Sequence, residues 1–521
     1  MKLKSSSFKE PLTGIGVSSR YAIVPRKNHR SAEERVLADS IYWHDYEAFG
    51  SDPRRDRASQ FAGLRTDSEL NVIGEPLMLY CRPAPDMLPH PEACLVTGIT
   101  PQKALARGLP EAEFMARIHR ELAVPGTCVA GYNSIRFDDE LTRQTLYRNF
   151  FDPYEREWKN GNSRWDIIDM MRLCHAVRPQ GVEWPQRKDG APSFRLEDLT
   201  AANDIEHSGA HDALADVRAT IALAALVRKH HPKLYAHVFA LRRKASVQEQ
   251  IDLQRQKPFL HVSAMYGSEK GALAPVMPLA AHPVDRNGII VCDLRQDPTE
   301  WLSLDAEGIR ARLFVPASEL PEGQSRIPLK VLHINRCPVI APINVLEPER
   351  AGRFAIDMER CRRHWEILSG RKDLAAILAD VFRPREEAAE MPGDPDFMLY
   401  GGGFFSSGDR ERIRAVREAS PEALVGRDFG FEDARLPEML FRYRARNWPE
   451  TLLDTEQERW RRFCAERLAR APGTPGAGPG LQEFREALLR LGSEREDEQS
   501  LQLLQQLELW ANELLAFAGS G

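Results

Sequence analysis

The chain has 521 residues, 42% of them hydrophobic and 28% charged, and its formal net charge at pH 7 is −5. At about 150 residues per domain, this length predicts three domains with separate cores rather than one. The charge does not indicate an obligate polyanion binder, although it is compatible with a local basic channel. No apolar run approaches the ~18 residues of a membrane span, so we expect no membrane segment.

Residues 1–38 are polar and basic and lack the apolar core of a secretory signal, and we interpret them as a flexible extension. The eight cysteines are scattered along the chain without a CxxC pair. This pattern is typical of reduced thiols in a cytoplasmic protein.

Strand-like and helical patterns alternate from residue 39 to 232, which predicts a mixed α/β domain. We expect strands at residues 42–50 (YWHDYEAFG), 58–67, 76–83 and 127–133. A helix is expected to begin at Thr100 and Pro101, because proline loses no hydrogen bond at the first helical position. Residues 211–227 (HDALADVRATIALAALV) predict an amphipathic helix.

Short β-rich pieces separated by proline and glycine follow from residue 233 to 382, and they predict a small barrel-like β domain with a helical end. Residues 383–396 are charged and rich in proline, so we expect a linker there. Helical patterns dominate residues 397–521. Apolar residues recur at spacings of three and four over 481–491 and 503–517, which predicts two helices that each pack one apolar stripe.

Two carboxylates, Asp45 and Glu47, stand two residues apart in the first predicted strand. Because side chains alternate along a strand, both project from one face, while His44 and Tyr46 project from the other. Burying two like charges side by side is costly unless a proton or a cation lies between them. From this stretch alone, an edge strand whose acids face water is an equally good interpretation.

Two further acidic clusters fall in the same domain, Asp138 with Asp139, and Asp212 with Asp216 beside His211. Oxygen ligands suit a pair of Mg²⁺ or Mn²⁺ ions, which can stabilise both the attacking and the leaving oxygen of phosphoryl transfer. A histidine that titrates near neutral pH suits the accompanying base. Taken alone, Asp212 is equally well explained as an acid at a helix start and His211 as a surface residue.

Two other chemistries are disfavoured. His207 and His211 form an HxxxH pair, but no third ligand at a telling distance and no cysteine cluster accompanies it, as a zinc site would require. No GxxxxGK[ST] loop occurs, which argues against an ATP-driven motor.

Basic and aromatic residues interleave where a nucleic-acid strand could run, because bases stack on aromatic rings and guanidinium groups pair with phosphates. In the first domain these residues are Arg143, Tyr147, Arg148, Trp158, Arg164, Trp165, Arg172 and Arg195. Residues 440–447 (LFRYRARN) add three arginines at alternate positions in the last domain.

The order of Asp45, Glu47, Asp138, His211 and Asp216 matches the pattern of DEDDh 3′-to-5′ exonucleases. The stretches HDYEAFG, GYNSIRFDDE, PSFRLEDLT, HDALADV, LHINRCPV and LFRYRARN resemble bacterial exonuclease I, a family of single-strand-specific DNA exonucleases, and the resemblance runs over about residues 41–455. It implies an RNase H-like exonuclease domain, an SH3-like β domain and a C-terminal helical domain.

The resemblance also implies roles for individual residues. His211 would be the general base, and two Mg²⁺ ions, which Mn²⁺ can replace, would be held by Asp45, Glu47, Asp138 and Asp216, with Glu47 and Asp138 also taking part in catalysis. DNA contacts would fall on Glu47, Arg143, Tyr154, Trp158, Arg172 and Arg195. The protein would act as a monomer, and a docking site for the acidic, Phe-ended tail of single-strand DNA-binding protein would include Arg442, Arg444 and Arg446.

The residues and the resemblance together predict an Mg²⁺-dependent exodeoxyribonuclease that releases 5′-mononucleotides from the 3′ end of single-stranded DNA in repair and recombination. Two alternatives stay open. One is an exoribonuclease that trims RNA with the same catalytic set, because no residue decides between DNA and RNA. The other is a single-strand-binding module whose nuclease site has decayed, against which the presence of all four acids and the histidine argues.

Overall fold

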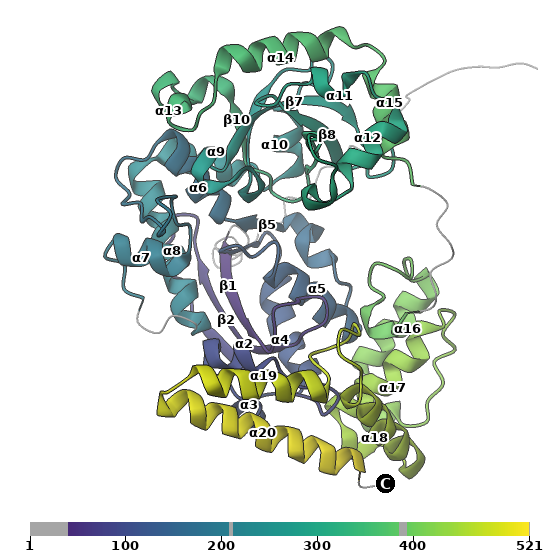
Figure 1. Ribbon diagram of the computed structural model, residues 1–521. Coiled ribbons are helices and arrows are strands. Elements are labelled where there is room, and N and C mark those ends of the chain that lie inside the picture. The colour runs from purple at the N-terminus through teal and green to yellow at the C-terminus, as the bar shows by residue number, and fades with distance from the viewer. Residues whose placement is uncertain (1–39, 208–211, 385–392, 520–521) are drawn as a thin grey trace, which may run out of the picture.

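The computed structural model describes residues 40–207, 212–384 and 393–519. The expected N-terminal extension, His211 and most of the expected linker lie outside the described residues. The described chain forms a central α/β domain, a β domain above it, and C-terminal helices that run along one side and beneath the central domain (Figure 1).

The central domain is built on a mixed sheet with the strand order β3-β2-β1-β4-β5. β1 pairs antiparallel with β2 and parallel with β4, so it lies in the middle of the sheet. The strands predicted within residues 42–133 are confirmed. The bounds are β1 (Ile41–Ala48), β2 (Ala58–Thr66), β3 (Leu77–Tyr80), β4 (Cys128–Gly131) and β5 (Ser163–Asp166).

Helices cover the central sheet, and α8 packs directly against β1 and β2. The helix predicted at Pro101 is also present, and the Thr100 side chain accepts a hydrogen bond from the Lys103 amide at its first turn. The bounds are α2 (Pro91–Thr97), α3 (Pro101–Arg107), α4 (Glu111–Leu122), α5 (Asp138–Arg148), α6 (Ile168–Val177), α7 (Leu196–Ala202), α8 (Ala213–His230), α9 (Pro232–Ala240) and α10 (Lys244–Gln248).

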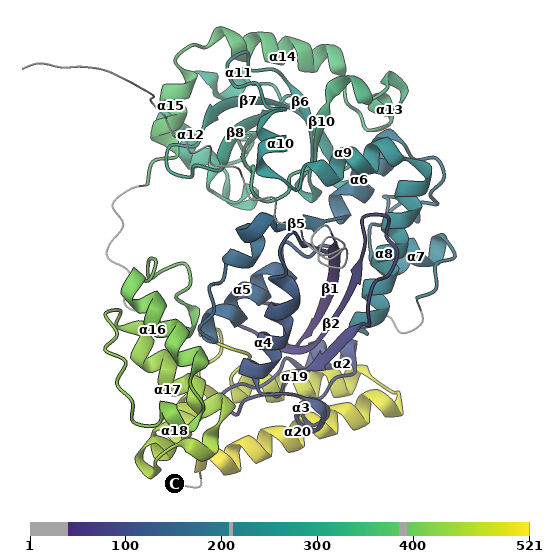
Figure 2. The same ribbon diagram turned by 180° about the vertical axis from the view of Figure 1, so that it is seen from behind.

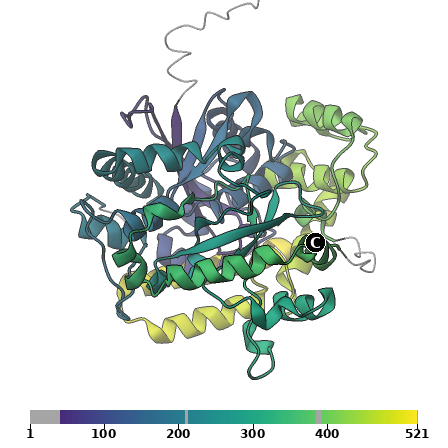
Figure 3. The same cartoon turned by 90° about the horizontal axis from the view of Figure 1, so that it is seen from above.

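The β domain contains an antiparallel sheet with the strand order β10-β6-β7-β8-β9, flanked by helices. The strands are β6 (Phe259–Val262), β7 (Leu273–Ala281), β8 (Gly288–Asp293), β9 (Leu329–His333) and β10 (Ile340–Pro342). The helices are α11 (Thr299–Leu302), α12 (Ala306–Leu313), α13 (Pro348–Arg353), α14 (Met358–Gly370) and α15 (Leu374–Val381). Seen from above, this domain lies over the central domain (Figure 3).

The C-terminal part is helical, with α16 (Ser407–Glu418), α17 (Arg435–Asn447), α18 (Asp454–Leu468), α19 (Leu481–Glu494) and α20 (Glu498–Gly519). α19 and α20 run beneath α2 and α3, as both side views show (Figures 1 and 2). The predicted apolar stripes face this contact, since Phe484, Leu507 and Trp510 share one buried cluster with Met87 and Leu88 of the central domain.

A buried ionic network also joins the C-terminal part to the central domain. Asp86 of the central domain contacts Arg446 at 2.9 Å and Arg467 at 3.3 Å, and Arg446 and Arg467 also contact Asp396. The Asp86 and Asp396 side chains are 0% and 1% exposed, so these charges are removed from water. Breaking such a pair by removing one partner is strongly destabilising, because it leaves an uncompensated buried charge.

All eight cysteines are free thiols, and all but the partly exposed Cys337 are buried, as expected for core residues. None of the helices in the described part of the chain combines the length and the apolar character that a membrane span requires.

Candidate active site

Asp45 and Glu47 lie near the end of β1, the central strand. Their Cα partners on β2 are Ala62 and Gln60, so the strand is paired along this edge. On the opposite edge β4 pairs only with residues 41–43, which leaves the backbone of β1 open beside the two acids. The predicted alternation is confirmed, because the rings of His44 and Tyr46 lie together on the other face, against Phe61.

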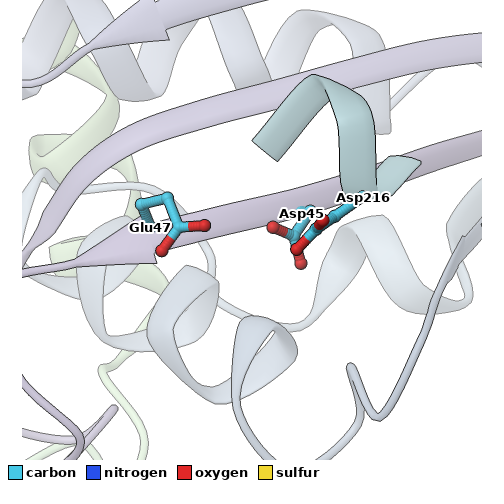
Figure 4. A group of neighbouring side chains, drawn as sticks. All are labelled: Asp45, Glu47 and Asp216. Atoms are coloured by element: carbon cyan, nitrogen blue, oxygen red, sulfur yellow. The ribbon is translucent and has the colours of Figure 1, made fainter. Parts of the chain in front are cut away.

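Asp216 approaches the same face from α8. Carboxylate oxygens of Asp45, Glu47 and Asp216 lie within 4.8 Å of one another. Asp45 and Asp216 face each other, with Glu47 further along the strand (Figure 4). These acids therefore do not form an edge that faces water, and they make a group that could hold a metal ion.

Asp138 reaches β1 from the first turn of α5 and is 4% exposed. Its Oδ1 accepts a hydrogen bond of 3.1 Å from the backbone N–H of Tyr46, between the two strand acids. The Asp138 carboxylate thereby occupies the open edge of β1 that β4 leaves unpaired. It lies outside the group of three whose oxygens converge within 4.8 Å.

The acids strongly perturb one another. Burial, followed by the charges of Asp138, Glu47 and Asp216, raises the pKa of Asp45 well above its ordinary value. Burial and the neighbouring Asp216 raise the pKa of Glu47 from 4.5 to about 8. Burial and Asp139 raise the pKa of Asp138. The charged forms of these groups are therefore unfavourable without a compensating cation.

Asp212 serves as the N-cap of α8, where its carboxylate accepts hydrogen bonds from the amides of Leu214 and Ala215. The helix-start interpretation of this residue is therefore correct. His211 lies outside the described residues. Another histidine, His207, contacts Asp216, with 2.5 Å between Nε2 and Oδ1.

A cavity of about 630 Å³ opens over the acids. Asp45 and Asp216 line it together with two of the predicted DNA-contacting residues, Arg172 and Arg195. The Arg195 side chain is 69% exposed and pairs with the neighbouring Glu197, at 2.9 Å. The opposite wall comes from the β domain, at Ala264 and residues 267–269 and 272. The cavity is therefore shaped by two domains.

A second cavity, of about 550 Å³, adjoins the first through Arg172. Basic residues from both domains line it: Arg54, Arg136, Arg143, Arg164, Arg172, Lys330 and Arg336. Arg143 is also bound to Glu157, with 2.7 Å between Nε and Oε1, and its guanidinium lies 5.8 Å from the Tyr154 ring centroid. This surface is suited to the phosphates of a single strand.

Two exposed aromatic rings are linked to the cavity-lining Arg143, since Trp158 follows its partner Glu157 in the chain and Phe404 contacts its partner Tyr154. Trp158 is 64% exposed, and Phe404 of the C-terminal part is 92% exposed and lies edge-on to Tyr154, with 6.5 Å between ring centroids. Large rings exposed to this degree offer stacking faces to unpaired bases. By contrast Tyr147 and Trp165, which the sequence pattern also suggested, are buried core residues.

Arg148 and Arg164 are structural as well as basic. Arg148 is buried and pairs with Glu111 at 3.0 Å, and Arg164 is buried and pairs with Asp139 at 2.7 Å. Only Arg164 of these two lines a cavity.

The arginines proposed for partner docking point inward. Arg442 pairs with Asp394 and Asp396, and Arg444 pairs with Glu456 at 2.7 Å. Arg446, whose side chain is 3% exposed, belongs to the buried network with Asp86. The positive charges of Arg442, Arg444 and Arg446 are neutralised inside the protein, which makes them structural residues rather than a docking surface.

Sequence reasoning missed the contribution of the β domain, namely Lys330 and Arg336. Burial lowers the pKa of Lys330 to about 8, and its Nζ donates to Ser263 Oγ at 2.8 Å. The two residues flank the sequence VLHIN at residues 331–335, and this placement of basic residues at both ends of a predicted strand was the signal that could have identified them.

Family models match the chain in three consecutive segments. An exonuclease model matches residues 42–224, an exonuclease I SH3-like domain model matches 242–384, and an exonuclease I C-terminal domain model matches 393–514. The expected RNase H-like, SH3-like and helical architecture is confirmed at this level.

Similar proteins share this architecture. Exodeoxyribonuclease I of Escherichia coli is 48% identical over 422 residues, which cover 81% of this chain and 88% of that protein. The structure of exonuclease I from Methylocaldum szegediense is 52% identical, covers 91% of this chain and 99% of its own, and has a TM-score of 0.86. The structure of E. coli exonuclease I in complex with a dA16 oligonucleotide has a TM-score of 0.86 at 45% identity, covering 91% of this chain and 100% of its own.

Proposed function

The chain belongs to the exodeoxyribonuclease I family and is a single-strand DNA exonuclease, and on this premise we propose that it removes 5′-mononucleotides from the 3′ end by hydrolysis assisted by two divalent cations. The observation that carries the mechanism is the convergence of the Asp45, Glu47 and Asp216 carboxylates at the centre of the sheet. The dA16 oligonucleotide bound by the E. coli protein supports the substrate class.

The donor set fits hard divalent cations. It consists of carboxylate oxygens, which Mg²⁺ and Mn²⁺ prefer. Burial and, after it, repulsion by the neighbouring carboxylates raise the pKa values of Asp45 and Glu47, and bound cations would offset both effects. When bound, Mg²⁺ would polarise the attacking water and stabilise the charge that develops on the phosphate and the leaving oxygen.

The protein's own groups then have separate tasks. Asp45, Glu47 and Asp216 would hold the cations, and Asp138, fixed by the Tyr46 amide, would complete the set from the open edge of β1. Arg172 and Arg195 lie in the same cavity, where their guanidinium groups would bind and orient the terminal phosphates. His211 would accept the proton of the water; this role rests on the sequence pattern alone.

The two adjoining cavities and the exposed rings support a path for a single strand. Phosphates would follow the basic lining that Arg136, Arg143 and Lys330 provide, while bases stack on Trp158 and Phe404. Contacts of this kind accept any base, so binding would be independent of sequence and sensitive to salt.

We also propose that the acidic, Phe-ended tail of single-strand DNA-binding protein docks on the chain, at a place other than α17. An apolar cavity of about 590 Å³ lies where α6 and α9 meet the β domain, and its lining includes Leu234, Val345, Arg178 and Lys233. The apolar residues would receive a phenylalanine ring, and the exposed Lys233 would attract the carboxylates, together with Arg178, which pairs with Glu347 at 3.3 Å at the surface. Such a partner would place the exonuclease, acting as a monomer, in DNA repair and recombination.

Cleavage of labelled substrates tests the proposal. 5′-Labelled single-stranded DNA, duplex DNA and RNA are incubated with the protein and Mg²⁺, and we expect stepwise shortening of single-stranded DNA from its 3′ end. Asp45→Ala should abolish shortening, whereas Glu113→Gln, which changes an exposed carboxylate on α4, should leave it intact. Equal cleavage by Asp45→Ala would contradict the mechanism, and preference for RNA would contradict the substrate assignment.

A further inference from the structure

His207 is a buried histidine that directly contacts a proposed metal ligand. It follows α7 in the chain, and its side chain is 6% exposed. The Nε2 atom lies 2.5 Å from Oδ1 of Asp216, a distance within hydrogen-bonding range. In the sequence, His207 was considered only as one ligand of an HxxxH zinc site. In the structure its ring contacts a carboxylate of the proposed metal site.

The other nitrogen of the ring is also held. Nδ1 lies 3.1 Å from Thr200 Oγ1, and that hydroxyl lies 2.9 Å from the Leu196 carbonyl inside α7. In the tautomer with its proton on Nε2, the ring donates to Asp216. Nδ1 then accepts the single proton of the Thr200 hydroxyl when that hydroxyl turns from the Leu196 carbonyl towards the ring. The ring is therefore fixed at both nitrogens, on one side to α7 and on the other to α8.

A fixed donor matters at this position because Asp216 extends from a helix whereas Asp45 and Glu47 extend from a strand. The convergence of the three carboxylates within 4.8 Å depends on the rotamer of Asp216, and a donor to Oδ1 restricts that rotamer. Groups of this kind, placed behind a ligand, commonly contribute 10-fold to 100-fold to metal affinity or activity.

We propose that His207 is a positioning residue that holds the Asp216 carboxylate in the orientation needed to bind a divalent cation, with Thr200 holding the His207 ring in turn. The inference rests on the proposed function, since it assumes that Asp216 is a metal ligand. It assigns His207 no contact with substrate and no proton transfer, which distinguishes it from the general base.

Mn²⁺ binding tests this assignment without relying on catalysis. Free Mn²⁺ is counted by electron paramagnetic resonance during titration of the full-length wild-type protein, His207→Ala, His207→Gln and Thr200→Val. We expect His207→Ala to weaken Mn²⁺ binding about 10-fold to 100-fold. His207→Gln retains an N–H donor and should recover part of the affinity, and Thr200→Val should weaken binding by a smaller factor. His230→Gln, about 20 Å away at the far end of α8, is the matched control and should bind Mn²⁺ as wild type does.

Two further measurements separate positioning from other roles. Turnover of single-stranded DNA at saturating Mn²⁺ should recover most of the wild-type kcat in His207→Ala, with the defect confined to the metal concentration required. Thermal unfolding of the metal-free protein should change little. Wild-type Mn²⁺ affinity in His207→Ala would overturn the inference, as would a kcat that stays low at saturating metal or a collapse of the melting temperature. Asp216→Asn is run in parallel: if it too binds Mn²⁺ as wild type does, the proposed metal site itself is wrong.

Discussion

Replacing Glu47 by glutamine should stabilise the metal-free protein while it destroys activity. The pKa of Glu47 rises from 4.5 to about 8 on folding, so the folded state favours the protonated carboxyl. Below pH 4.5 the group is protonated in both states and has no effect on stability. As the pH rises from 4.5 to 8, ionisation increasingly penalises the folded state, and the penalty is complete above 8.

The size of the effect follows from the same values. At pH 7 the penalty spans about 2.5 pH units at about 1.4 kcal/mol each, or about 3 kcal/mol. Glutamine removes the charge but buries an amide, at a cost of about 1 kcal/mol, so the net gain is about 2 kcal/mol. For a domain of this size that raises the melting temperature by roughly 4–8 °C.

Thermal unfolding in EDTA at pH 5 and pH 7 measures the gain. At pH 5 the penalty is below about 1 kcal/mol, so the melting temperatures of Glu47→Gln and wild type should nearly coincide. The exposed Glu113→Gln should show no pH-dependent difference at all. An equal gain at both pH values, or no gain at pH 7, would refute the conclusion that burial and the neighbouring carboxylates raise the Glu47 pKa. In saturating Mg²⁺ at pH 7, the wild type should have the higher melting temperature, because only the wild type gains the full binding energy of the cations.

Three further predictions concern other parts of the molecule. Asp138→Asn should lower kcat on single-stranded DNA at least 100-fold with little loss of stability. Asp139→Asn should instead lower the melting temperature by several degrees, because it breaks the buried pairs with Arg156 and Arg164. The opposite pattern would show that Asp138 is the structural residue and Asp139 the catalytic one. Trp158→Ala should weaken oligonucleotide binding, measured by fluorescence anisotropy, about 5-fold to 100-fold, and an unchanged affinity would remove Trp158 from the strand path. Lys233→Glu should weaken binding of an acidic, Phe-ended peptide, while Lys372→Glu, at another exposed position, should not; equal losses would indicate non-specific attraction.

The sequence was most informative where local periodicity decides the outcome. Alternation along a strand correctly placed Asp45 and Glu47 on one face, and the amphipathic pattern after residue 211 correctly predicted α8. The positions of β1, β2, β3 and β4 followed from the same kind of pattern, whereas β5 was not predicted. In each case the pattern depends on residues that lie within a few positions of one another, so it can be read from the local sequence.

The sequence failed where the partner is distant in the chain. The sequence suggested that Arg446 is a surface cation, but in the structure it forms a buried ion pair with Asp86, which is 360 residues away in the chain. Arg442 and Arg444 were misjudged for the same reason, and because α17 is a helix, on which alternate positions do not share a face. His207 is the converse case: it follows α7 and contacts Asp216 of α8, nine residues further along the chain, and no spacing rule anticipates that contact.

The buried network around Asp86 and Asp396 implies that two kinds of ionic contact in this molecule respond differently to added salt. Ions screen charges that face solvent over about 8–10 Å at physiological strength but reach fully buried pairs poorly. The basic cavity lining would therefore release its strand at a salt concentration that leaves the junction between the central domain and the C-terminal helices closed. Added salt should therefore dissociate the bound nucleic acid reversibly without separating the C-terminal helices from the central domain.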